Sequence, residues 1–261
     1  MCPVAWRLIA AEPRSSGEIV CHCLLIETGR GLVLVDTGYG LGDIAEPARL
    51  GWLLRVSRPR LDPAETALRQ VEALGFEADE VRDIIVTHLD VDHAGGLGDF
   101  PSAKVHLLRA ERDGSDRATG LLAPVRYRPK QWAHGPDWVT YEPGGGEAWN
   151  GFEAVRDLQG LPPEILLVPL TGHSPGHTAV AVEMNGGWLL HCGDAYFHRA
   201  EVDPSLPRGP RGADLFGRSA SVDESARRWN VRRLKTLRRE RGDSVRVFCA
   251  HDPEELNAAR G

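Results

Sequence analysis

The stretch "IIVTHLDVDHAGGL", residues Ile84–Leu97, places histidines and aspartates directly after a run of β-branched residues. Its apolar start predicts a short buried strand, and the "AGGL" at its end can enter a helix. In between, "HLDVDH" sets His88, Asp90, Asp92 and His93 into six positions. Imidazole nitrogens and carboxylate oxygens both bind divalent metal ions. The stretch is therefore either a charged loop that happens to carry histidines or part of a metal site.

The composition of the whole chain is that of an ordinary globular protein. Its 261 residues lie at the upper edge of what one hydrophobic core usually fills, so we expect a single domain, 1–261. The formal charge of -6 gives no electrostatic reason to expect nucleic acid as a partner, because nucleic-acid binders usually present a basic face. No window reaches roughly 18 apolar residues and the amino terminus lacks a signal-peptide pattern, so we expect a soluble, unexported protein without a membrane partner.

The five cysteines form an odd and scattered set, which is typical of a protein from a reducing cytoplasm and not of a disulfide framework. Cys21 and Cys23 flank His22 in "IVCHCLLIE", and strand alternation would point both thiols to the same face. They could form a thiolate zinc pair, but no second cysteine pair lies near them in sequence. We therefore favour two buried side chains that pack as small hydrophobes.

Alternating apolar stretches and turn residues predict a layered α/β protein. Strands are expected at "EIVCHCLLIET", "LVLVDTG", "DIIVT", "AKVHLLRAE", "EILLVPL", "AVAVEMN", "WLLHCGD" and "SVRVFCAHD", with a hairpin joining "AVAVEMN" to "WLLHCGD". Helices are expected in "LDPAETALRQVEALGF" and from Asp223 onward. In the second helix, Ala226, Trp229, Leu234 and Leu237 would form the apolar stripe.

Two segments lack a clean periodicity. Residues 112–160 are rich in Trp, Tyr, Pro and Gly, and we interpret them as an ordered excursion from the core. Residues 204–218 are rich in Pro, Gly and Arg and are expected to form a loop. The basic run "RRWNVRRLKTLRRERG" is interpreted as a solvated helix face in preference to a nucleic-acid-binding one.

Five predicted strands end in residues that can bind metal ions. In chain order these endings supply Asp36, the motif from His88 to His93, His173 with His177, Asp194, and His251 with Asp252. A lone histidine or aspartate after a strand is usually a cap or a turn residue, but several together favour a shared site. Two divalent ions bridged by a carboxylate can hold a hydroxide between them, and neutral imidazoles alone would leave their charge uncompensated.

In order and spacing, the five motifs resemble those of the metallo-β-lactamase superfamily, and "HLDVDH" with its "AGG" extension is the most specific of them. The resemblance spans nearly the whole chain, from Asp36 to His251. It implies a four-layer αββα sandwich with a dinuclear metal site along one edge. The implied cofactors are two divalent metal ions, with zinc expected first and manganese or iron as alternatives.

Carried over position by position, the resemblance implies a ligand set for each metal. His88, Asp90 and His173 would hold the first metal, Asp92, His93 and His251 would hold the second, and Asp194 would bridge the two. Asp36 would orient a ligand from behind. His177 would stabilise its loop or support a ligand, and His191 would pack within its strand.

Residue 90 is where the chain departs from the family, whose commonest form has histidine there. With Asp90, Asp92 and Asp194 ionised, the ligand charge would be about −3 against about +4 from two divalent ions, so one hydroxide would bring the centre close to neutral. Oxygen in place of nitrogen also shifts the preference towards manganese or iron. The alternative is that Asp90 points away and that only one metal binds well.

The resemblance implies hydrolysis by a metal-bound hydroxide, with Asp92 passing a proton to the leaving group. The motifs are most like those of the branch that includes N-acyl-homoserine lactone lactonases, so a small ester, lactone or related carbonyl compound is the expected substrate. That branch carries a tyrosine three residues after the bridging aspartate. Phe197 stands there in this chain and Tyr196 precedes it, so Tyr196 is the second candidate catalytic residue.

Other functions stay open at this point. They are an iron-dependent oxidoreductase acting on oxygen or a persulfide, a phosphodiesterase-type hydrolase, and a non-catalytic binding protein. The small-molecule substrate is expected to contact residues 112–160, where "RYRPKQW" could neutralise a carboxylate or stack on a planar group, and the loop after Asp194. If the chain assembles, we expect a homodimer.

Overall fold

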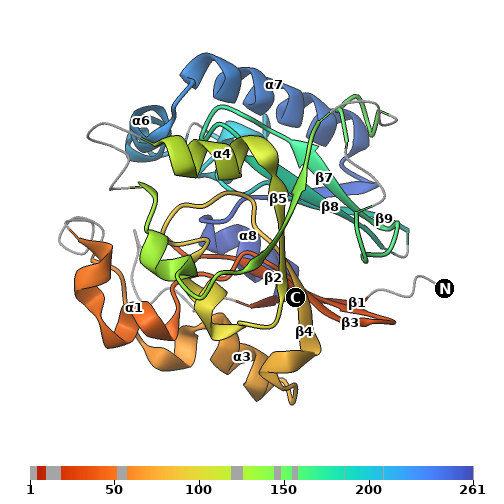
Figure 1. Ribbon diagram of the computed structural model, residues 1–261. Helices are drawn as coiled ribbons and strands as arrows, with labels where there is room; N and C mark the ends of the chain where they lie inside the picture. The colour runs from red at the N-terminus through yellow and green to blue at the C-terminus, as the bar shows by residue number, and fades with distance from the viewer. Residues whose placement is uncertain are drawn as a thin grey trace.

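The computed structural model describes residues 5–9, 19–51, 58–118, 126–143, 148–154, 158–184, 186–207 and 209–260. Its centre is a pair of β-sheets that pack against each other, with helices on the outer sides (Figure 1). The N-terminal sheet has the order β1 (Ala5–Ile9), β2 (Cys23–Thr28), β3 (Gly31–Val35), β4 (Val81–Ile85), β5 (Lys104–Leu108) and β6 (Asp137–Tyr141). The C-terminal sheet has the order β10 (Val245–Phe248), β9 (Gly187–His191), β8 (Thr178–Met184) and β7 (Ile165–Pro169).

Strand directions are mixed in both sheets. In the N-terminal sheet β1, β2 and β3 are antiparallel neighbours, whereas β3, β4, β5 and β6 run parallel. In the C-terminal sheet β7, β8 and β9 are antiparallel, and β10 adds in parallel to β9. The predicted hairpin is confirmed, because β8 pairs with β9 up to Met184 opposite Gly187.

The apolar residues of the strands fill the space between the sheets and also face the outer helices. On β2, Leu24 and Ile26 point to the C-terminal sheet, whereas Cys23 and Leu25 point to the opposite, helix-covered side. This alternation follows from the two-residue period of a strand. Because both faces of the sheet are covered, the strand is apolar throughout, and each fully buried Leu or Ile contributes about 2 kcal/mol to stability.

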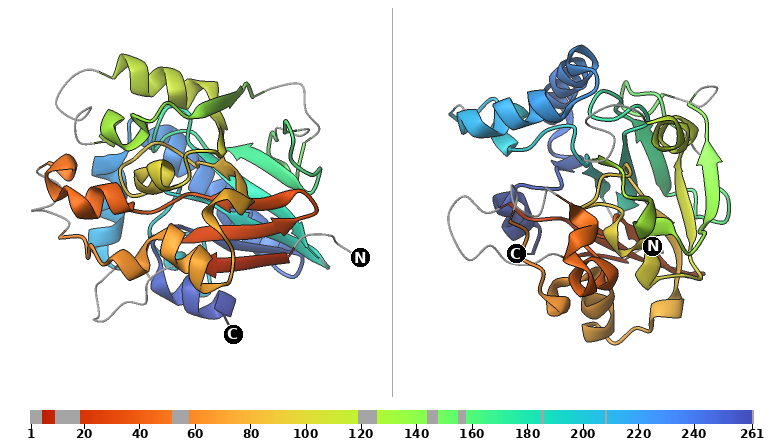
Figure 2. Two further views of the ribbon diagram at one scale, coloured as in Figure 1. Left: turned by 60° about the horizontal axis from the view of Figure 1, so that its bottom comes forward. Right: turned by 60° about the vertical axis from the view of Figure 1, so that its left-hand side comes forward.

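Helices complete the outer layers (Figure 2). The α-helices are α1 (Leu41–Ala45), α3 (Ala67–Ala73), α4 (Arg109–Arg117), α6 (Arg211–Ala220), α7 (Glu224–Arg241) and α8 (Pro253–Arg260). The 3₁₀-helices are η1 (Pro47–Leu50), η2 (Pro63–Glu65), η3 (Ala78–Glu80), η4 (Gly95–Asp99), η5 (Pro129–Trp132) and η6 (Arg199–Glu201). Side chains of α3 pack on the outer face of the N-terminal sheet, and Leu234 and Leu237 of α7 pack on that of the C-terminal sheet. The predicted αββα sandwich is confirmed.

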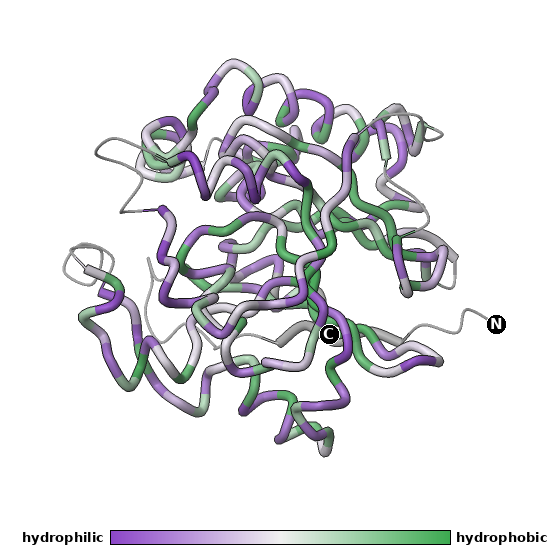
Figure 3. The backbone as a smooth tube through the Cα atoms, in the orientation of Figure 1, coloured by the Kyte–Doolittle hydropathy of each residue, from purple (hydrophilic) through white to green (hydrophobic). Residues whose placement is uncertain are grey.

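The α7 helix begins at the predicted residue but buries a different face. The Asp223 side chain caps it by accepting a hydrogen bond from the backbone N–H of Ala226 at 3.0 Å. Trp229, predicted in the apolar stripe, is 57% exposed, and Arg227 is buried instead. Arg227 donates to Glu224 and to Glu201, so paired charge replaces apolar packing there. Hydrophilic and hydrophobic stretches alternate along α7 in Figure 3, in agreement with a partly solvated helix.

Two segments predicted to lie outside regular structure contain elements. Residues 112–160 include β6, which extends the N-terminal sheet, although 119–125, 144–147 and 155–157 lie outside the described residues. Residues 204–218 include most of α6, which starts directly after Pro210, where proline no longer blocks helical hydrogen bonds. At Gly217, a Cβ would lie 3.1 Å from the Phe197 ring, so this glycine allows a close approach that local helix propensity does not predict.

Among the described residues, no helix is both long enough and apolar enough to cross a membrane.

Candidate metal centre

Side chains that follow β3, β4, β7, β9 and β10 meet at one edge of the two sheets. They form a cluster with two halves that share one carboxylate. We call His88, Asp90 and His173 the Asp90 half, and Asp92, His93 and His251 the Asp92 half. The segments are far apart in the chain, and the parallel strand pairs bring their ends together.

In the Asp90 half, two imidazoles face one carboxylate oxygen. Asp90 Oδ2 lies 3.0 Å from His173 Nε2 and 3.5 Å from His88 Nε2. The other ring nitrogen of His88 is 2.9 Å from Thr87 Oγ1, so the Nε2 atom is the one directed into the cluster. The alternative that Asp90 points away from the cluster is therefore wrong.

In the Asp92 half, one carboxylate again lies between two imidazoles. Asp92 Oδ2 is 3.7 Å from His251 Nε2, and Asp92 Oδ1 is 3.9 Å from His93 Nε2. The distal nitrogens are held from behind, because His251 Nδ1 contacts the Val20 carbonyl oxygen at 2.7 Å and His93 Nδ1 lies 2.8 Å from Asp36 Oδ2. These contacts point both Nε2 atoms inward.

Asp194 stands between the halves. Its Oδ2 lies 3.4 Å from His173 Nε2 and 3.8 Å from His88 Nε2, whereas its Oδ1 lies 3.2 Å from His93 Nε2 and 3.0 Å from His251 Nε2. Each oxygen therefore faces the imidazoles of one half. The backbone N–H of Asp194 donates to His177 Nε2 at 2.9 Å, so His177 fixes the position of this residue, in line with the supporting role expected for it.

Asp36 supports the cluster from behind. Its carboxylate accepts hydrogen bonds from the backbone N–H and the hydroxyl of Thr87 at 2.7 and 2.8 Å, and lies 2.8 Å from His93 Nδ1. Its φ of 56° is in the left-handed region, which costs about 1 kcal/mol for a residue other than glycine. These three contacts offset that cost and fix the start of the motif loop.

The carboxylates of the cluster are stabilised in their ionised form by positive charge beside them. Burial alone would raise the pKa of Asp194, but His251, His93 and His173 outweigh it and hold that pKa well below its usual range. Burial would lower the pKa of His93, yet Asp194 and Asp36 hold it well above its usual value. Without a metal, the imidazolium protons would therefore neutralise the carboxylates. Metal binding replaces such protons.

Among the cluster's buried atoms that make no hydrogen bond, three face one another: His88 Nε2, His93 Nε2 and Asp194 Oδ1. An unsatisfied buried polar atom usually costs about 1–3 kcal/mol. Divalent ions between these atoms would satisfy all of them, and imidazole with carboxylate is a donor set that zinc, manganese and iron accept. The residues therefore fit the two metal ions that the sequence motifs imply.

Arg126 is a neighbour of the cluster that the motifs did not reveal. Its Nη1 lies 3.1 Å from Asp90 Oδ1, so one oxygen of Asp90 faces the arginine and the other faces the imidazoles. Both side chains are largely buried, with exposed fractions of 11% and 16%. Burial opposes ionisation of Asp90, but Arg126 and His88 outweigh it and hold its pKa well below the usual range. The "RYRPKQW" segment thus neutralises a carboxylate, but one of the protein itself.

Glu111 on α4 is another residue without a sequence signal. It is fully buried and accepts hydrogen bonds from the backbone of Leu89 at 3.0 Å, the Ser174 hydroxyl at 2.6 Å and the backbone of Gly176 at 2.9 Å. These contacts tie the "HLDVDH" loop to the "GHSPGH" loop. Glu111 therefore sets the spacing between the two loops that supply the Asp90 half.

Tyr196 does not reach the cluster, which contradicts the catalytic role expected for it. Its side chain is fully buried in the core of the C-terminal sheet, and its hydroxyl donates to Glu255 at 3.0 Å. Phe197 takes the place beside the cluster instead. Its ring stacks on that of His251 with centroids 5.4 Å apart. The two neighbouring side chains therefore lie in different surroundings, Tyr196 beside Glu255 and Phe197 beside His251.

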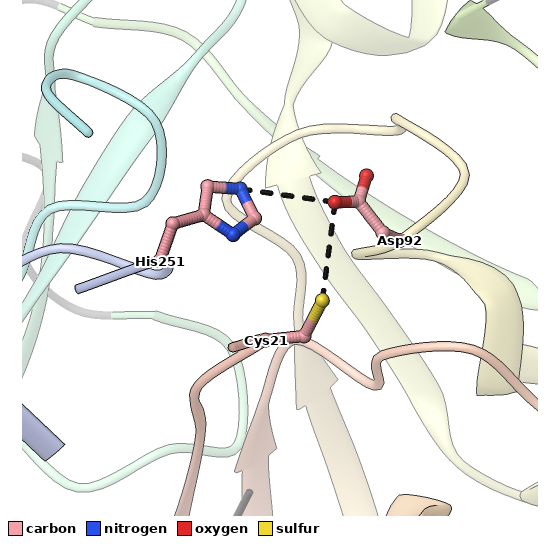
Figure 4. Close-up of side chains that lie close together, drawn as sticks. All are labelled: Cys21, Asp92 and His251. Carbon is pink, nitrogen blue, oxygen red and sulfur yellow. Dashed lines mark hydrogen bonds and ion pairs between the residues drawn. The ribbon is translucent and has the colours of Figure 1, made fainter. Parts of the chain in front are cut away.

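Of the two neighbouring cysteines, Cys21 differs from expectation. β2 begins at Cys23, so strand alternation does not extend back to Cys21. Cys23 is buried against the outer helices as expected, whereas Cys21 is half-buried and its Sγ lies 3.9 Å from Asp92 Oδ2 (Figure 4). The prediction that His191 packs within its strand is confirmed, because its side chain is buried and its Nε2 lies 3.1 Å from the His22 carbonyl oxygen. Cys2 lies outside the described residues.

Comparison with known proteins agrees with this geometry. The chain matches the family model of the metallo-beta-lactamase superfamily over residues 16–251. It is 43% identical over 242 residues to a probable metallo-hydrolase of Mycobacterium tuberculosis, which covers 93% of this chain and 77% of the relative. It is 27% identical over 253 residues to an N-acyl homoserine lactonase of Azorhizobium caulinodans, with 91% and 83% covered.

The fold has solved counterparts as well. An N-acyl homoserine lactone hydrolase, solved with the product N-hexanoyl-L-homoserine at its catalytic metal center, superposes with a TM-score of 0.68. The two sequences are 20% identical, and the match covers 99% of this chain and 97% of that one. At this identity the likeness establishes a shared fold.

Proposed function

This chain belongs to the metallo-beta-lactamase superfamily of hydrolases, and on that premise we propose that it binds two divalent metal ions and hydrolyses a small lactone or ester. The observation that carries the proposal is the position of Asp194, whose two oxygens face separate pairs of imidazoles. A carboxylate shared in this way is suited to bridging two cations. Lactones are the preferred candidate substrates because several relatives that match most of the chain are named N-acyl homoserine lactonases.

When bound, the two ions would supply Lewis acidity at the substrate carbonyl and at the attacking water. The chain's own contribution is to hold the donors in place, through Asp36 behind His93 and the Val20 carbonyl behind His251. Asp92 has an exposed fraction of 22%, so a leaving group can reach its carboxylate. In the proposed mechanism, Asp92 would take up the proton that the attacking water loses and pass it to the departing alkoxide.

Phe197 and Phe216 would contact the apolar part of the substrate. Phe197 stacks on His251, and its ring centroid is 5.0 Å from that of Phe216 on α6. Phe216 is 52% exposed, so the pair forms an apolar wall that leads from solvent to the cluster. Such a wall favours a substrate with an acyl chain, because burying its methylenes contributes about 0.8 kcal/mol each.

Zinc remains the first choice of metal despite the third carboxylate. Arg126 neutralises the charge that Asp90 adds, so the charge that faces the ions is close to that of a centre with a neutral ligand at this position. Manganese and iron remain alternatives because the donor set also accepts them.

The proposal is tested by metal analysis and substrate turnover on the purified full chain. The expected result is about two equivalents of metal, with lactones turned over faster than thioesters, β-lactams or phosphodiesters and with rates rising with acyl-chain length. Apoprotein reloaded separately with zinc, manganese and iron identifies the active metal. Turnover of phosphodiesters alone, thiol oxidation with iron alone, or less than one equivalent of bound metal would refute the proposal.

A further inference from the structure

A thiol lies against the Asp92 half of the cluster. Cys21 Sγ is 3.9 Å from Asp92 Oδ2, which in turn is 3.7 Å from His251 Nε2. Donor atoms of these three side chains all lie within 4.8 Å of one another. In Figure 4 the three side chains come from separate segments and point towards the same space.

These separations are close to those of ligands around one metal ion. With bonds of about 2.0–2.3 Å to nitrogen, oxygen and sulfur, two ligands of one ion that subtend an angle of about 110–120° stand about 3.3–4.0 Å apart. The observed 3.7 and 3.9 Å need shifts of at most a few tenths of an ångström. A side-chain rotation of Cys21 or Asp92 provides such a shift.

Independent evidence that a ligand belongs in this space comes from two other atoms. His93 Nε2 and Asp194 Oδ1 are buried, lie 3.2 Å apart and make no hydrogen bond. His93 and Asp194 are 1% and 5% exposed, and both atoms belong to the side of the cluster that Cys21 borders. The thiol is thus next to a set of unsatisfied donors and is not a lone cysteine on a surface.

The backbone around Cys21 fixes it in this position. The Val20 carbonyl oxygen lies 2.7 Å from His251 Nδ1, and the backbone N–H of His22 donates to the Ala250 carbonyl at 2.8 Å. The residues on both sides of Cys21 are therefore tied to the loop that carries His251. A thiol and an imidazole held by shared backbone contacts can bind one ion with little loss of conformational entropy.

We propose that Cys21 is a thiolate ligand of the metal ion in the Asp92 half, together with Asp92, His93, His251 and the shared carboxylate of Asp194. On binding, the thiol proton is released to solvent and a metal–sulfur bond forms. The inference rests on the proposed metal centre and adds a difference between its two ions. The Asp92 half has a soft sulfur donor that selects zinc over manganese, whereas the Asp90 half has only nitrogen and oxygen donors.

Cobalt(II) spectroscopy tests the inference without relying on activity. Apoprotein loaded with Co(II) is expected to show a near-ultraviolet cysteinate-to-cobalt charge-transfer band. The band should be absent in Cys21→Ala and Cys21→Ser, with the visible ligand-field bands retained. Cys23→Ala is the matched control, because Cys23 is two residues away and packs in the outer core, and it should keep the band. A band that persists in Cys21→Ala overturns the inference.

A second measurement uses the unaltered protein and needs no variant to fold. Iodoacetamide labelling, followed by mass spectrometry of the Cys21 peptide, is expected to slow at least about 10-fold on adding zinc and to recover with a chelator. Equal labelling rates with and without zinc overturn the inference.

The outcomes separate this inference from the proposed function. If two Co(II) ions bind and lactones are hydrolysed but no charge-transfer band appears, the thiolate assignment fails and the proposed function stands. If no Co(II) binds, both fail. Loading with zinc and an excess of manganese should leave about one zinc in the wild type and markedly less in Cys21→Ala.

Discussion

The two halves of the cluster use the same residue types but differ in what lies beside their carboxylates. Asp90 shares its charge with Arg126, which comes from a distant segment, whereas Asp92 faces His251 and the Cys21 thiol. The difference shows that an aspartate in place of the family's commoner histidine need not make a site more anionic. The charge is balanced by a second residue, so the pair, and not the single position, determines the electrostatics.

The largest effect is expected when the residue common to both halves is removed. Asp194→Ala should lower activity at least about 1,000-fold, on the order of 4 kcal/mol, because neither metal keeps its shared carboxylate. Metal content should fall in both halves. The measurement is kcat/KM together with metal analysis of the purified variant, and Asp79→Ala, an exposed aspartate outside the cluster, is the control. A variant that lost only one metal would show that Asp194 belongs to one half and does not bridge.

Removing the cation behind the Asp90 half should have the next largest effect. Arg126→Met removes the cation that faces Asp90 Oδ1, and breaking a buried pair in this way costs about 3 kcal/mol. Urea unfolding of the metal-free protein measures the loss. The double variant Asp90→His, Arg126→Met should recover most of it, since a neutral imidazole needs no opposite charge beside it. Equal stabilities of the single variant and the wild type would mean that Arg126 does not balance Asp90.

The free energy of unfolding should depend on pH through the carboxyl group of Glu255, which lies on α8 and follows His251 in the chain. Burial raises the pKa of Glu255 from 4.5 to about 7, although hydrogen bonds from the Cys249 backbone and from Tyr196 oppose the rise. The folded protein therefore binds this proton more tightly than the unfolded chain. The resulting stabilisation is fully present below pH 4.5 and is lost as the pH rises through about 7, a change of about 3 kcal/mol.

Comparing the wild type with Glu255→Gln isolates this proton from other titrating groups. The difference in free energy of unfolding of the two metal-free proteins should change between pH 5 and pH 8, because glutamine does not titrate. A difference that stays constant over that range would show that Glu255 is ionised in the folded protein at both pH values.

The strand ends and the donors of the cluster could be predicted because they are encoded locally. Each donor lies within a few residues of an apolar strand, so His88 or His173 can be found without knowing the fold. Arg126 and Glu111 could not, since both lie in segments without a motif and act only through tertiary proximity.

Orientation was harder to predict than position. A shift of one residue decides whether Tyr196 or Phe197 faces the cluster, and strand alternation could not be extended to Cys21 because β2 starts after it. On α7, an arginine buried with Glu224 and Glu201 displaced Trp229 from the inner face. On α7, the long-range pair of Arg227 with Glu201 is a contact that the local pattern cannot predict.

The last prediction replaces one carboxylate oxygen of Asp36 with an amide NH₂ group, and its effect should be confined to the Asp92 half. Asp36→Asn keeps the shape of the side chain, and asparagine tolerates the left-handed backbone at φ 56°, so the loop should keep its conformation. The amide can present its NH₂ group to His93 Nδ1, which would leave the proton on the Nε2 atom that faces the metal. We expect zinc affinity to fall about 10–100-fold in the Asp92 half and to change little in the Asp90 half, measured by competition with a chromophoric chelator.

Asp43→Asn is the control, because Asp43 is also buried but bonds to Gln131 outside the cluster. Since Asp36 contacts His93 and Thr87 but no donor atom of Asp90 or His173, an equal loss in both halves would mean that it supports the motif loop as a whole and does not orient His93.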